Sequence, residues 1–370
     1  SGVINVTPKP SGSGDELRIH NTHGYGNATI ILNDGVTMDT AVSSATIDIG
    51  GLAGTSGAII GPGAKSSGNP TWVVGWSNTT NTFDGSIEDD GVSSIVKVGT
   101  GEWILTGQNA YTGSTIVSNG VLALATGTYG DAYVGSSTNF FIAAGATLDV
   151  IGQSTRTMDV SSGQTLGGSG IVNGILDSTG GGTLAPGDAV NIGILTVTTN
   201  INLGGTYIAK INVAGTPNSD QLLSPAINLN GVNIIVTNVG PSLHVGDTFK
   251  LLNGTLTGSI GSVTVPDTDY YTWDTSQLAT EGIIKVTATQ VPPTISNVDV
   301  SALSSGFITI NATGGVPGSP VSVLTSTNVA LPLSSWTQVY SGNFDGSGNL
   351  STTISADPSQ PQQFYILQTQ

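Results

Sequence analysis

The chain of 370 residues contains no cysteine, so neither disulfides nor thiolate metal sites can stabilise it. Charged residues make up only 9% of the sequence, and 24 acidic residues against 8 basic ones give a net charge of −16. This balance repels polyphosphates and offers no basic groove, so we expect no nucleic-acid partner. No apolar run approaches the roughly 20 residues that span a bilayer, so we expect no membrane span.

Residues that favour helices are also scarce. Glutamate occurs only four times, whereas the 53 glycines are accompanied by many Asp, Asn, Thr and Ser residues, which compete with helices and favour turns and strands. Hydrophobic residues still amount to 37%, enough for a sizeable core. The composition therefore predicts an all-β protein.

Short apolar segments that alternate with polar residues fill the middle of the chain, as in 28–34, 45–51 and 146–152. Gly, Asn or Asp separates them, and similar turns recur about every 20 residues, which is typical of stacked coils whose neighbours complete one core. We predict a β-solenoid over residues 27–290. Residues 1–26, with Pro8, Pro10 and the Gly/Ser-rich 11–14, are predicted to form an N-terminal arm.

The pattern from 82 to 124 is more specific. Its Phe-x-Gly, Lys-x-Gly-x-Gly, Leu-x-Gly-x-Asn, Tyr-Thr-Gly and Gly-x-Leu elements resemble the autotransporter passenger-associated repeat, and 164–197, 219–236 and 246–254 look like the segments that follow it. The resemblance implies a right-handed parallel β-helix on an exported surface protein. The matching positions are Phe83, Gly85, Lys97, Gly99, Gly101, Leu105, Gly107, Asn109, Tyr111, Thr112, Gly113, Thr115, Gly120 and Leu122.

The pattern changes after the prolines of 291–297. Longer alternating runs follow, with a predicted hairpin turn in the Phe-Asp-Gly-Ser-Gly-Asn segment that begins at Phe344. We predict a small immunoglobulin-like or fibronectin-like sandwich over residues 291–370. Segments 324–344 and 361–367 resemble the C-terminal module that ends many exported repeat proteins of verrucomicrobia-like bacteria.

An enzyme is the first function to test, because polysaccharide lyases and pectinases share the solenoid architecture. A lyase needs a base beside a cation or metal, and a hydrolase needs clustered carboxylates. Neither set is evident, and we expect no enzyme. The basic residues Lys97, Arg156, Lys210, Lys250 and Lys285 lie in separate segments, and the acidic groups Glu88, Asp89 and Asp90, and Asp267 with Asp269, suit solvated turns.

Metal sites have weak support in the sequence. His20 and His23 could share one ion with Asp15 or Glu16, but no further ligand at a fixed distance is evident. Calcium is the better candidate, because the acidic turn at 88–90 and the loop from Asp345 to Asn349 offer oxygen ligands. No cofactor is otherwise expected.

Clustered aromatic residues are candidate carbohydrate contacts. Their rings could stack on sugar faces, or they could cover the open end of a solenoid, which is our preferred interpretation of the cluster near residue 271. Two tryptophans with even spacing are predicted to share one strand face, and their role is open. These residues are Tyr270, Tyr271 and Trp273, and Trp72 with Trp76.

The N-terminal segment is a candidate for self-association. Val3, Ile4 and Val6 lie in a β-compatible run that could add a strand to a neighbouring subunit, and such a non-closing contact would produce filaments. The alternative is a disordered terminus that remains after export. The Ser1-Gly2-Val3 start looks processed, so we expect an extracellular or cell-surface protein whose signal peptide has been removed.

Two hypotheses therefore remain. The first is a non-catalytic extracellular structural protein that forms a surface layer, fibre or filament by head-to-tail strand addition. The second is a carbohydrate-binding or polysaccharide-degrading β-helix protein. A groove of Asp, Lys and aromatic side chains on one solenoid face would favour the second.

Overall fold

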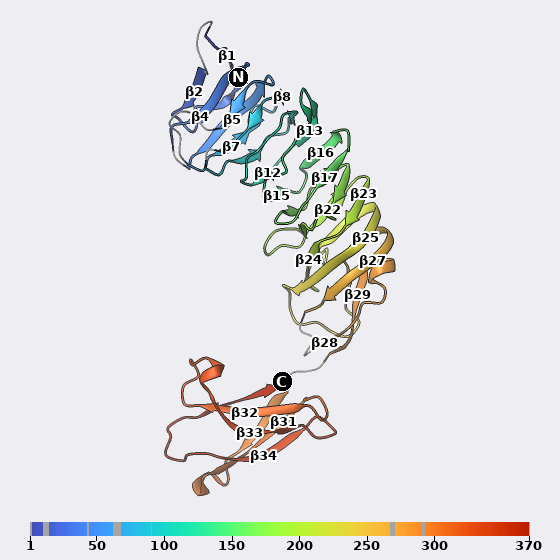
Figure 1. The fold of residues 1–370 in the computed structure, drawn as a ribbon. Coiled ribbons are helices and arrows are strands. Elements are labelled where there is room, and N and C mark those ends of the chain that lie inside the picture. Colours follow the sequence, from blue (N-terminus) through green and yellow to red (C-terminus); the bar gives the residue numbers. More distant parts are fainter. Residues whose placement is uncertain are drawn as a thin grey trace. The chain divides into compact units, whose positions relative to one another are not determined.

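The computed structural model describes residues 2–9, 15–42, 44–61, 68–89, 91–266, 271–289 and 293–369 (Figure 1). They form two compact units, a β-solenoid and a small antiparallel sandwich. The helices described are the short α1 (Leu278–Glu281) and the 3-10 turns η1 (Leu303–Ser305) and η2 (Leu333–Ser335). None of them is long and apolar enough to cross a membrane. The predicted all-β fold is confirmed.

The solenoid coils pass through three parallel sheets, here named faces A, B and C. Long strands bend from one face to the next, so that one strand contributes to two or three faces. Face A consists of β5 (Thr46–Gly54), β7 (Thr71–Val74), β10 (Ser94–Lys97), β12 (Thr115–Val117), β15 (Asn139–Ile142), β18 (Thr165–Gly168), β21 (Thr183–Pro186), β24 (Thr206–Ile211) and the ends of β25 (Gln221–Asn238) and β27 (Leu252–Thr264).

Faces B and C complete each coil, and the antiparallel β14 (Gly130–Asp131) pairs with β13 beside them. Face B consists of β1 (Gly2–Val6), β3 (Tyr25–Leu32), the end of β5, β8 (Asn81–Phe83), β11 (Glu102–Leu105), β13 (Val121–Gly127), β16 (Thr147–Gly152), β19 (Ile171–Asn173), β22 (Ile194–Val197) and the starts of β25 and β27. Face C consists of β2 (Asp15–Ile19), β4 (Val36–Thr40), β6 (Ile59–Ile60) and β9 (Ser86–Ile87), and farther along the chain of β17 (Thr157–Asp159), β20 (Ile175–Asp177), β23 (Asn200–Leu203) and the middles of β25 and β27.

Side chains stack in ladders because parallel strands in register place like positions above one another. On face A one buried ladder runs nearly the length of the solenoid, and only one of its members is not a large apolar or aromatic residue. Stacking of this kind removes each apolar face from water only when the next coil is present. The ladder is Ile47, Trp72, Ile95, Thr115, Phe140, Leu166, Leu184, Tyr207 and Ile234.

The N-terminal segment differs from the predicted free arm. β1 runs parallel to β3 in register from Gly2 with Ala28 to Val6 with Leu32, and β2 pairs with β4. Residues 2–6 and 15–19 thus add coil strands to faces B and C. Their alternation and β-branched residues suit a strand edge better than a solvated arm, because pairing satisfies their backbone groups.

The last coil is partly covered. β26 (Thr248–Lys250) pairs antiparallel with β29 (Ile283–Thr289), which belongs to one sheet with β28 (Tyr271–Asp274). The N–H groups of Leu251 and Leu252 both donate to the Gly282 carbonyl. This end of face B is closed, whereas from Thr255 to Thr264 β27 pairs with β25 alone among the described residues.

The C-terminal unit packs two three-stranded antiparallel sheets around one apolar core that includes Ile310 and Val323. Its Asp345 turn does not close a hairpin, because β33 (Thr337–Asn343) and β34 (Leu350–Ser355) belong to different sheets. The hairpin prediction is wrong, since the local turn signal does not specify which strand the chain meets next. The sheets are β30 (Thr294–Asp299), β31 (Phe307–Thr313) and β34 (Leu350–Ser355), and β33 (Thr337–Asn343), β32 (Pro320–Ser326) and β35 (Phe364–Thr369).

Candidate functional site

The coil that carries the repeat pattern is built around close backbone contacts. Gly99 has a φ of 68°, in the left-handed region that favours glycine. A Cβ on Gly107 would lie 1.9 Å from the Gly85 carbonyl oxygen of the preceding coil. Gly99 therefore serves a turn, and Gly107 a close approach of two backbones.

Lys97 points into this coil and is only 1% exposed. Its ammonium donates to the carbonyls of Val98 at 2.6 Å, Gly99 at 3.0 Å and Asn119 at 3.2 Å. Burial lowers the pKa of Lys97 to about 8. The side chain therefore binds corner carbonyls of two successive coils and does not face a polymer outside.

Hydroxyl groups of the repeat coil and the coil after it form a buried chain of hydrogen bonds. The Tyr111 hydroxyl lies 2.7 Å from Thr115 Oγ1, which donates to Ser137 Oγ at 2.9 Å, and Ser137 donates to the Gly113 carbonyl at 2.7 Å. Burial raises the pKa of Tyr111. This chain crosses from the repeat coil to the next one, and it accounts for the hydroxyl in the apolar ladder of face A.

The acidic turn is tied to the repeat. Asp89 accepts hydrogen bonds from the N–H of Ser93 at 2.9 Å and from the N–H and hydroxyl of Thr112 at 3.0 and 2.6 Å. Glu88 accepts one from Ser86 at 2.9 Å. Asp89 thus holds the Tyr-Thr-Gly turn to the preceding coil. Asp90 lies outside the described residues.

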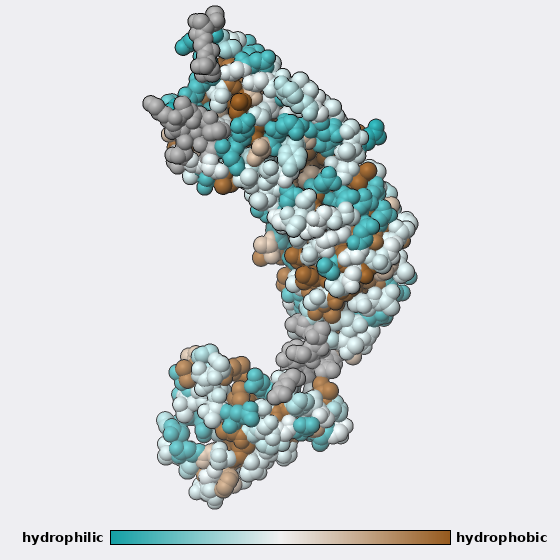
Figure 2. Space-filling view, viewed as in Figure 1, coloured by the Kyte–Doolittle hydropathy of each residue, from teal (hydrophilic) through white to brown (hydrophobic). Residues whose placement is uncertain are grey.

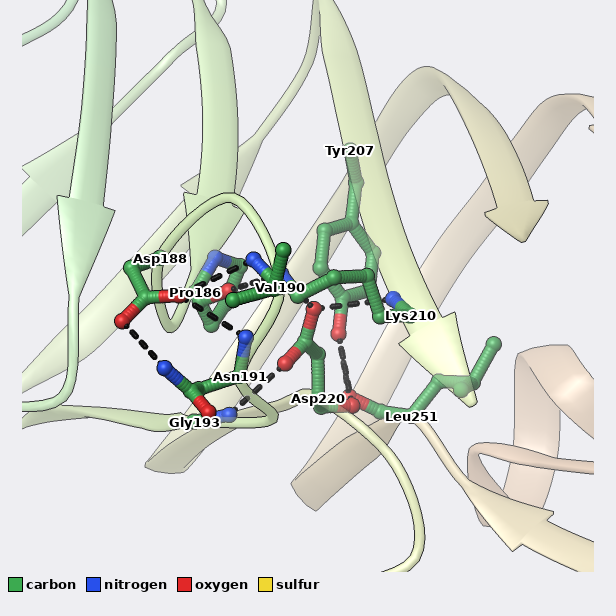
Figure 3. A network of polar contacts seen from close by, with 9 residues as sticks. All are labelled: Pro186, Asp188, Val190, Asn191, Gly193, Tyr207, Lys210, Asp220 and Leu251. Carbon is green, nitrogen blue, oxygen red and sulfur yellow. Dashed lines mark hydrogen bonds and ion pairs between the residues drawn. The ribbon is translucent and has the colours of Figure 1, made fainter. Parts of the chain in front are cut away.

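A second polar network lies farther along the solenoid (Figure 3). Lys210 Nζ is 2.7 Å from Asp220 Oδ2 and donates to the Pro186 carbonyl at 2.8 Å. Asp220 also accepts the backbone N–H groups of Gly193 at 2.7 Å and Lys210 at 2.8 Å. Both side chains are buried, at 9% and 0% exposure. Burial raises the pKa of Asp220, and these donors partly offset that effect.

Tyr207 and the 187–193 loop extend the network. The Tyr207 hydroxyl donates to the carbonyls of Asp220 and Leu251 at 3.1 and 3.0 Å, so it joins the beginnings of two coils (Figure 3). Asp188 accepts the Asn191 side chain at 2.7 Å and the N–H of Val190 at 2.9 Å, which lowers its pKa to about 2. The alternation of β24 places Lys210 on the outward side with Thr206 and Ile208, where it lines a hollow with Asp188. The sequence offered no local signal for its buried partner Asp220.

The other basic candidates do not gather into a site. Lys250 donates to the Glu281 carbonyl at 2.6 Å, and Arg156 lies in a turn with a φ of 54°. Lys285 pairs with Thr248 in the antiparallel sheet at the end of the solenoid. Asp267 and Asp269 lie outside the described residues.

The two tryptophans do not share a face. Trp72 is 1% exposed and belongs to the inward ladder, so it is not available to a sugar, and the prediction for it is wrong. Trp76 is 50% exposed. The two rings lie on different sides because Gly75, which stands between them, has a φ of 127° and interrupts the alternation of the strand. Even spacing gives a common face only along an unbroken strand.

Trp76 lies beside two polar side chains from the first coils. Its Nε1 donates to Asp48 at 3.1 Å, and His23 Nδ1 is 2.8 Å from the other oxygen of that carboxylate. They line a shallow hollow of about 270 Å³ together with Gly24, Gly26 and Asn27.

Tyr271 and Trp273 contact edge to face, with ring centres 6.5 Å apart. The Tyr271 hydroxyl accepts the N–H of Leu243 at 3.1 Å. Tyr270 lies outside the described residues. Whether these rings stack on sugars or cover the coil stays a prediction.

Several of the predicted metal ligands have partners within the chain. His20 is exposed. Asp15 accepts the N–H of Lys9, and Glu16 lies 3.4 Å from Arg18. No group of three or more His, Asp or Glu side chains able to hold a metal occurs in the described residues. The Asp345 carboxylate accepts the N–H groups of Ser347 and Asn349, each at 2.8 Å.

The assembly candidates lie on the outermost strand of face B. Val3 is 67% exposed, while Ile4 and Val6 are half-buried. Within the described residues β1 has register partners on β3 alone. One edge of β1 is therefore free for another strand.

One comparison with known proteins bears on the repeat coil. Residues 95–124 match the family model of the passenger-associated-transport-repeat. No curated protein matches the chain, and the likeness proposed for the C-terminal module stays a prediction. Together with the parallel solenoid, the match supports a passenger-like β-helix repeat protein and suggests that it is exported.

Proposed function

We propose that this chain is a non-catalytic structural protein of the cell surface whose subunits join end to end through free strand edges. The observation that carries the proposal is that, within the described residues, β1 at one end of the solenoid and β27 from Thr255 to Thr264 at the other have strand partners on one side only. An unpaired edge exposes N–H and C=O groups that can pair with another chain.

The composition of these edges supports pairing. Proteins commonly protect a free edge with Lys, Pro or inward-pointing charges. Neither β1, Gly-Val-Ile-Asn-Val, nor β27 from Leu252 to Thr264 contains a charged residue or a proline. Contact between opposite ends of identical subunits is heterologous, and it produces filaments when it does not close.

The buried cations support a non-catalytic role. Lys97 and Lys210 are buried and donate to backbone carbonyls, as structural groups do. Each of them connects successive coils. A lyase base must reach a proton on its substrate. Export and removal of a signal peptide belong to the same proposal and rest on the repeat match.

A mixing experiment with two variants tests the end-to-end contact. Val3→Lys charges the β1 edge, and Ser259→Lys charges an exposed position of β27. Each variant alone should lose filaments in negative-stain microscopy, while an equal mixture should form dimers, because each variant keeps one intact end.

The matched control is Val190→Lys, a valine that is 71% exposed on a loop of the solenoid. It should form filaments as the wild type does. Wild-type protein that stays without end-to-end assembly at high concentration, or a control that loses assembly as fully as Val3→Lys, would contradict the proposal.

Carbohydrate binding is the second candidate, because Trp76 leaves part of its ring exposed beside Asp48. Stacking on a sugar face with a nearby carboxylate is a common mode of glycan recognition. Calorimetric titration with soluble oligosaccharides should then show binding that Trp76→Ala abolishes and Trp336→Ala, in the sandwich, leaves intact.

A further inference from the structure

The outer surface of face A differs from faces B and C of this acidic molecule, because two of its rows of outward side chains carry no charge from β7 to β25. Lys210 on β24 lies beside them on the same side. Faces B and C each present carboxylates, such as Asp149 on β16 and Asp177 on β20. One row is polar and hydroxyl-rich and the other is apolar. The polar row is Thr71, Ser94, Asn139, Thr165, Thr183, Thr206 and Asn233, and the apolar row is Val73, Val96, Ile116, Phe141, Gly167, Ala185, Ile208 and Ile235.

The apolar row is uneven. Phe141 stands next to Gly167, which is followed by Ala185 and then by the larger Ile208. The two small residues leave a hollow of about 380 Å³, with Phe141, Ile208, Asp188 and Lys210 among its lining residues. Apolar surface gathers over β24 in Figure 2. On one ladder of face A, the Phe141 ring therefore stands next to the hollow over Gly167 and Ala185, here named the Gly167–Ala185 trough.

We propose that face A binds the same face of a second copy of this chain, in a two-fold arrangement that seats the Phe141 ring of each copy in the Gly167–Ala185 trough of the other. A two-fold contact is self-complementary, so that a ring and a trough separated by one or two strands satisfy each other across the axis. This side-by-side contact is independent of the proposed end-to-end contact.

Two physical arguments identify a second copy as the occupant. With a net charge of −16, two copies repel each other through surfaces that carry carboxylates, whereas these two rows of face A bring none together. The Asp188 carboxylate that lines the hollow is accompanied there by Lys210, a charge of opposite sign. The strand spacing of about 4.8 Å is identical in both copies. The side chains of the hydroxyl-rich and apolar rows of one copy can therefore stay aligned with those of the other copy over many strands.

The test is sedimentation of the full chain carrying Val3→Lys, which blocks the end-to-end contact, over about 1 μM to 1 mM. We expect a concentration-dependent dimer. Adding Phe141→Glu should shift the dissociation constant at least tenfold toward monomer. The matched control Ile171→Glu places the same charge on an outward, half-buried position of face B and should leave the dimer unchanged. Circular dichroism and thermal unfolding establish that each variant is folded.

Exchanging the ring and the trough gives a sharper test. Ala185→Phe should fill the trough and weaken the dimer, and the double variant Phe141→Ala/Ala185→Phe should restore it, because the ring and the small residue have traded places. A monomer across the whole concentration range, equal effects of Phe141→Glu and Ile171→Glu, or a folded double variant weaker than both single variants would overturn the proposal. So would Phe141-dependent binding of a neutral oligosaccharide by a chain that stays monomeric.

Discussion

The solenoid and the sandwich use different kinds of core. In the sandwich the core cluster is entirely apolar, and the buried polar residues described there are Ser322, Thr325 and Thr352, all on strands. Among its described residues the solenoid buries four charged ones, Asp39, Lys97, Lys210 and Asp220, along with the Tyr111 hydroxyl chain.

The difference follows from where each fold places its turns. A sandwich turns its chain at the rims of the sheets, where water satisfies the backbone. A solenoid turns at corners that stack on one another, so corner carbonyls are enclosed between coils and need internal partners. Lys97 and Lys210 supply such partners, and this comparison leads to three predictions.

The largest effect is expected from Lys210→Met. It leaves Asp220 buried without its cation, which costs about 3–5 kcal/mol of unfolding free energy. In denaturant titrations followed by circular dichroism, the solenoid transition should shift while the sandwich transition stays in place. Ile310→Ala, a fully buried position of the sandwich core, should do the reverse, at about 2–5 kcal/mol.

Adding Asp220→Asn to Lys210→Met removes the uncompensated charge and should recover part of the loss. A Lys210→Met variant as stable as the wild type would show that the buried pair is dispensable. The corner argument would then fail for this network.

Gly107→Ala should have an intermediate effect. The new methyl would meet the Gly85 carbonyl at 1.9 Å, and relieving that overlap must move one coil against the next, which costs about 1–3 kcal/mol. Gly346→Ala in the sandwich turn meets nothing within 4 Å and should change stability by less than about 0.5 kcal/mol. Equal melting temperatures for the two variants would refute the close-contact interpretation.

The third prediction concerns pH. Burial lowers the pKa of Lys97 to about 8, from 10.5 for a free side chain, so between these values the unfolded state binds more protons. The unfolding free energy should therefore rise with pH through that window, by at most about 1.4 kcal/mol per unit. Above pH 10 the raised pKa of Tyr111 opposes this, because the unfolded tyrosine then loses its proton first.

The measurement is best made between pH 8 and 10, by denaturant unfolding of the wild type and of Lys97→Met. The variant lacks the titrating amine, so its profile should be flatter. Parallel profiles would mean that Lys97 titrates alike in the folded and unfolded states.

The repeat coil could be predicted in detail because its signals are local. The positions of Gly99 and Gly107 follow from turns and contacts that recur with each coil, and the alternation gives the inward residues of β10 and β12. The Lys210–Asp220 pair could not be predicted in the same way, because it closes over a loop whose path depends on the coils above and below it.

Two other positions show where local patterns fail. Trp72 and Trp76 have the spacing of one strand face, yet the left-handed region at Gly75 separates them. Residues 2–6 have the composition of an arm and a strand alike, and pairing with β3 decides between them.

The sequence by itself determined the all-β class, the stacked coils and the turn glycines, because alternation and glycine spacing act over a few residues. Only the tertiary structure decided which faces carry charge, which strand edges stay free and which polar side chains are enclosed. These properties depend on register between strands that are distant in the chain, and register is fixed by the packing of whole coils.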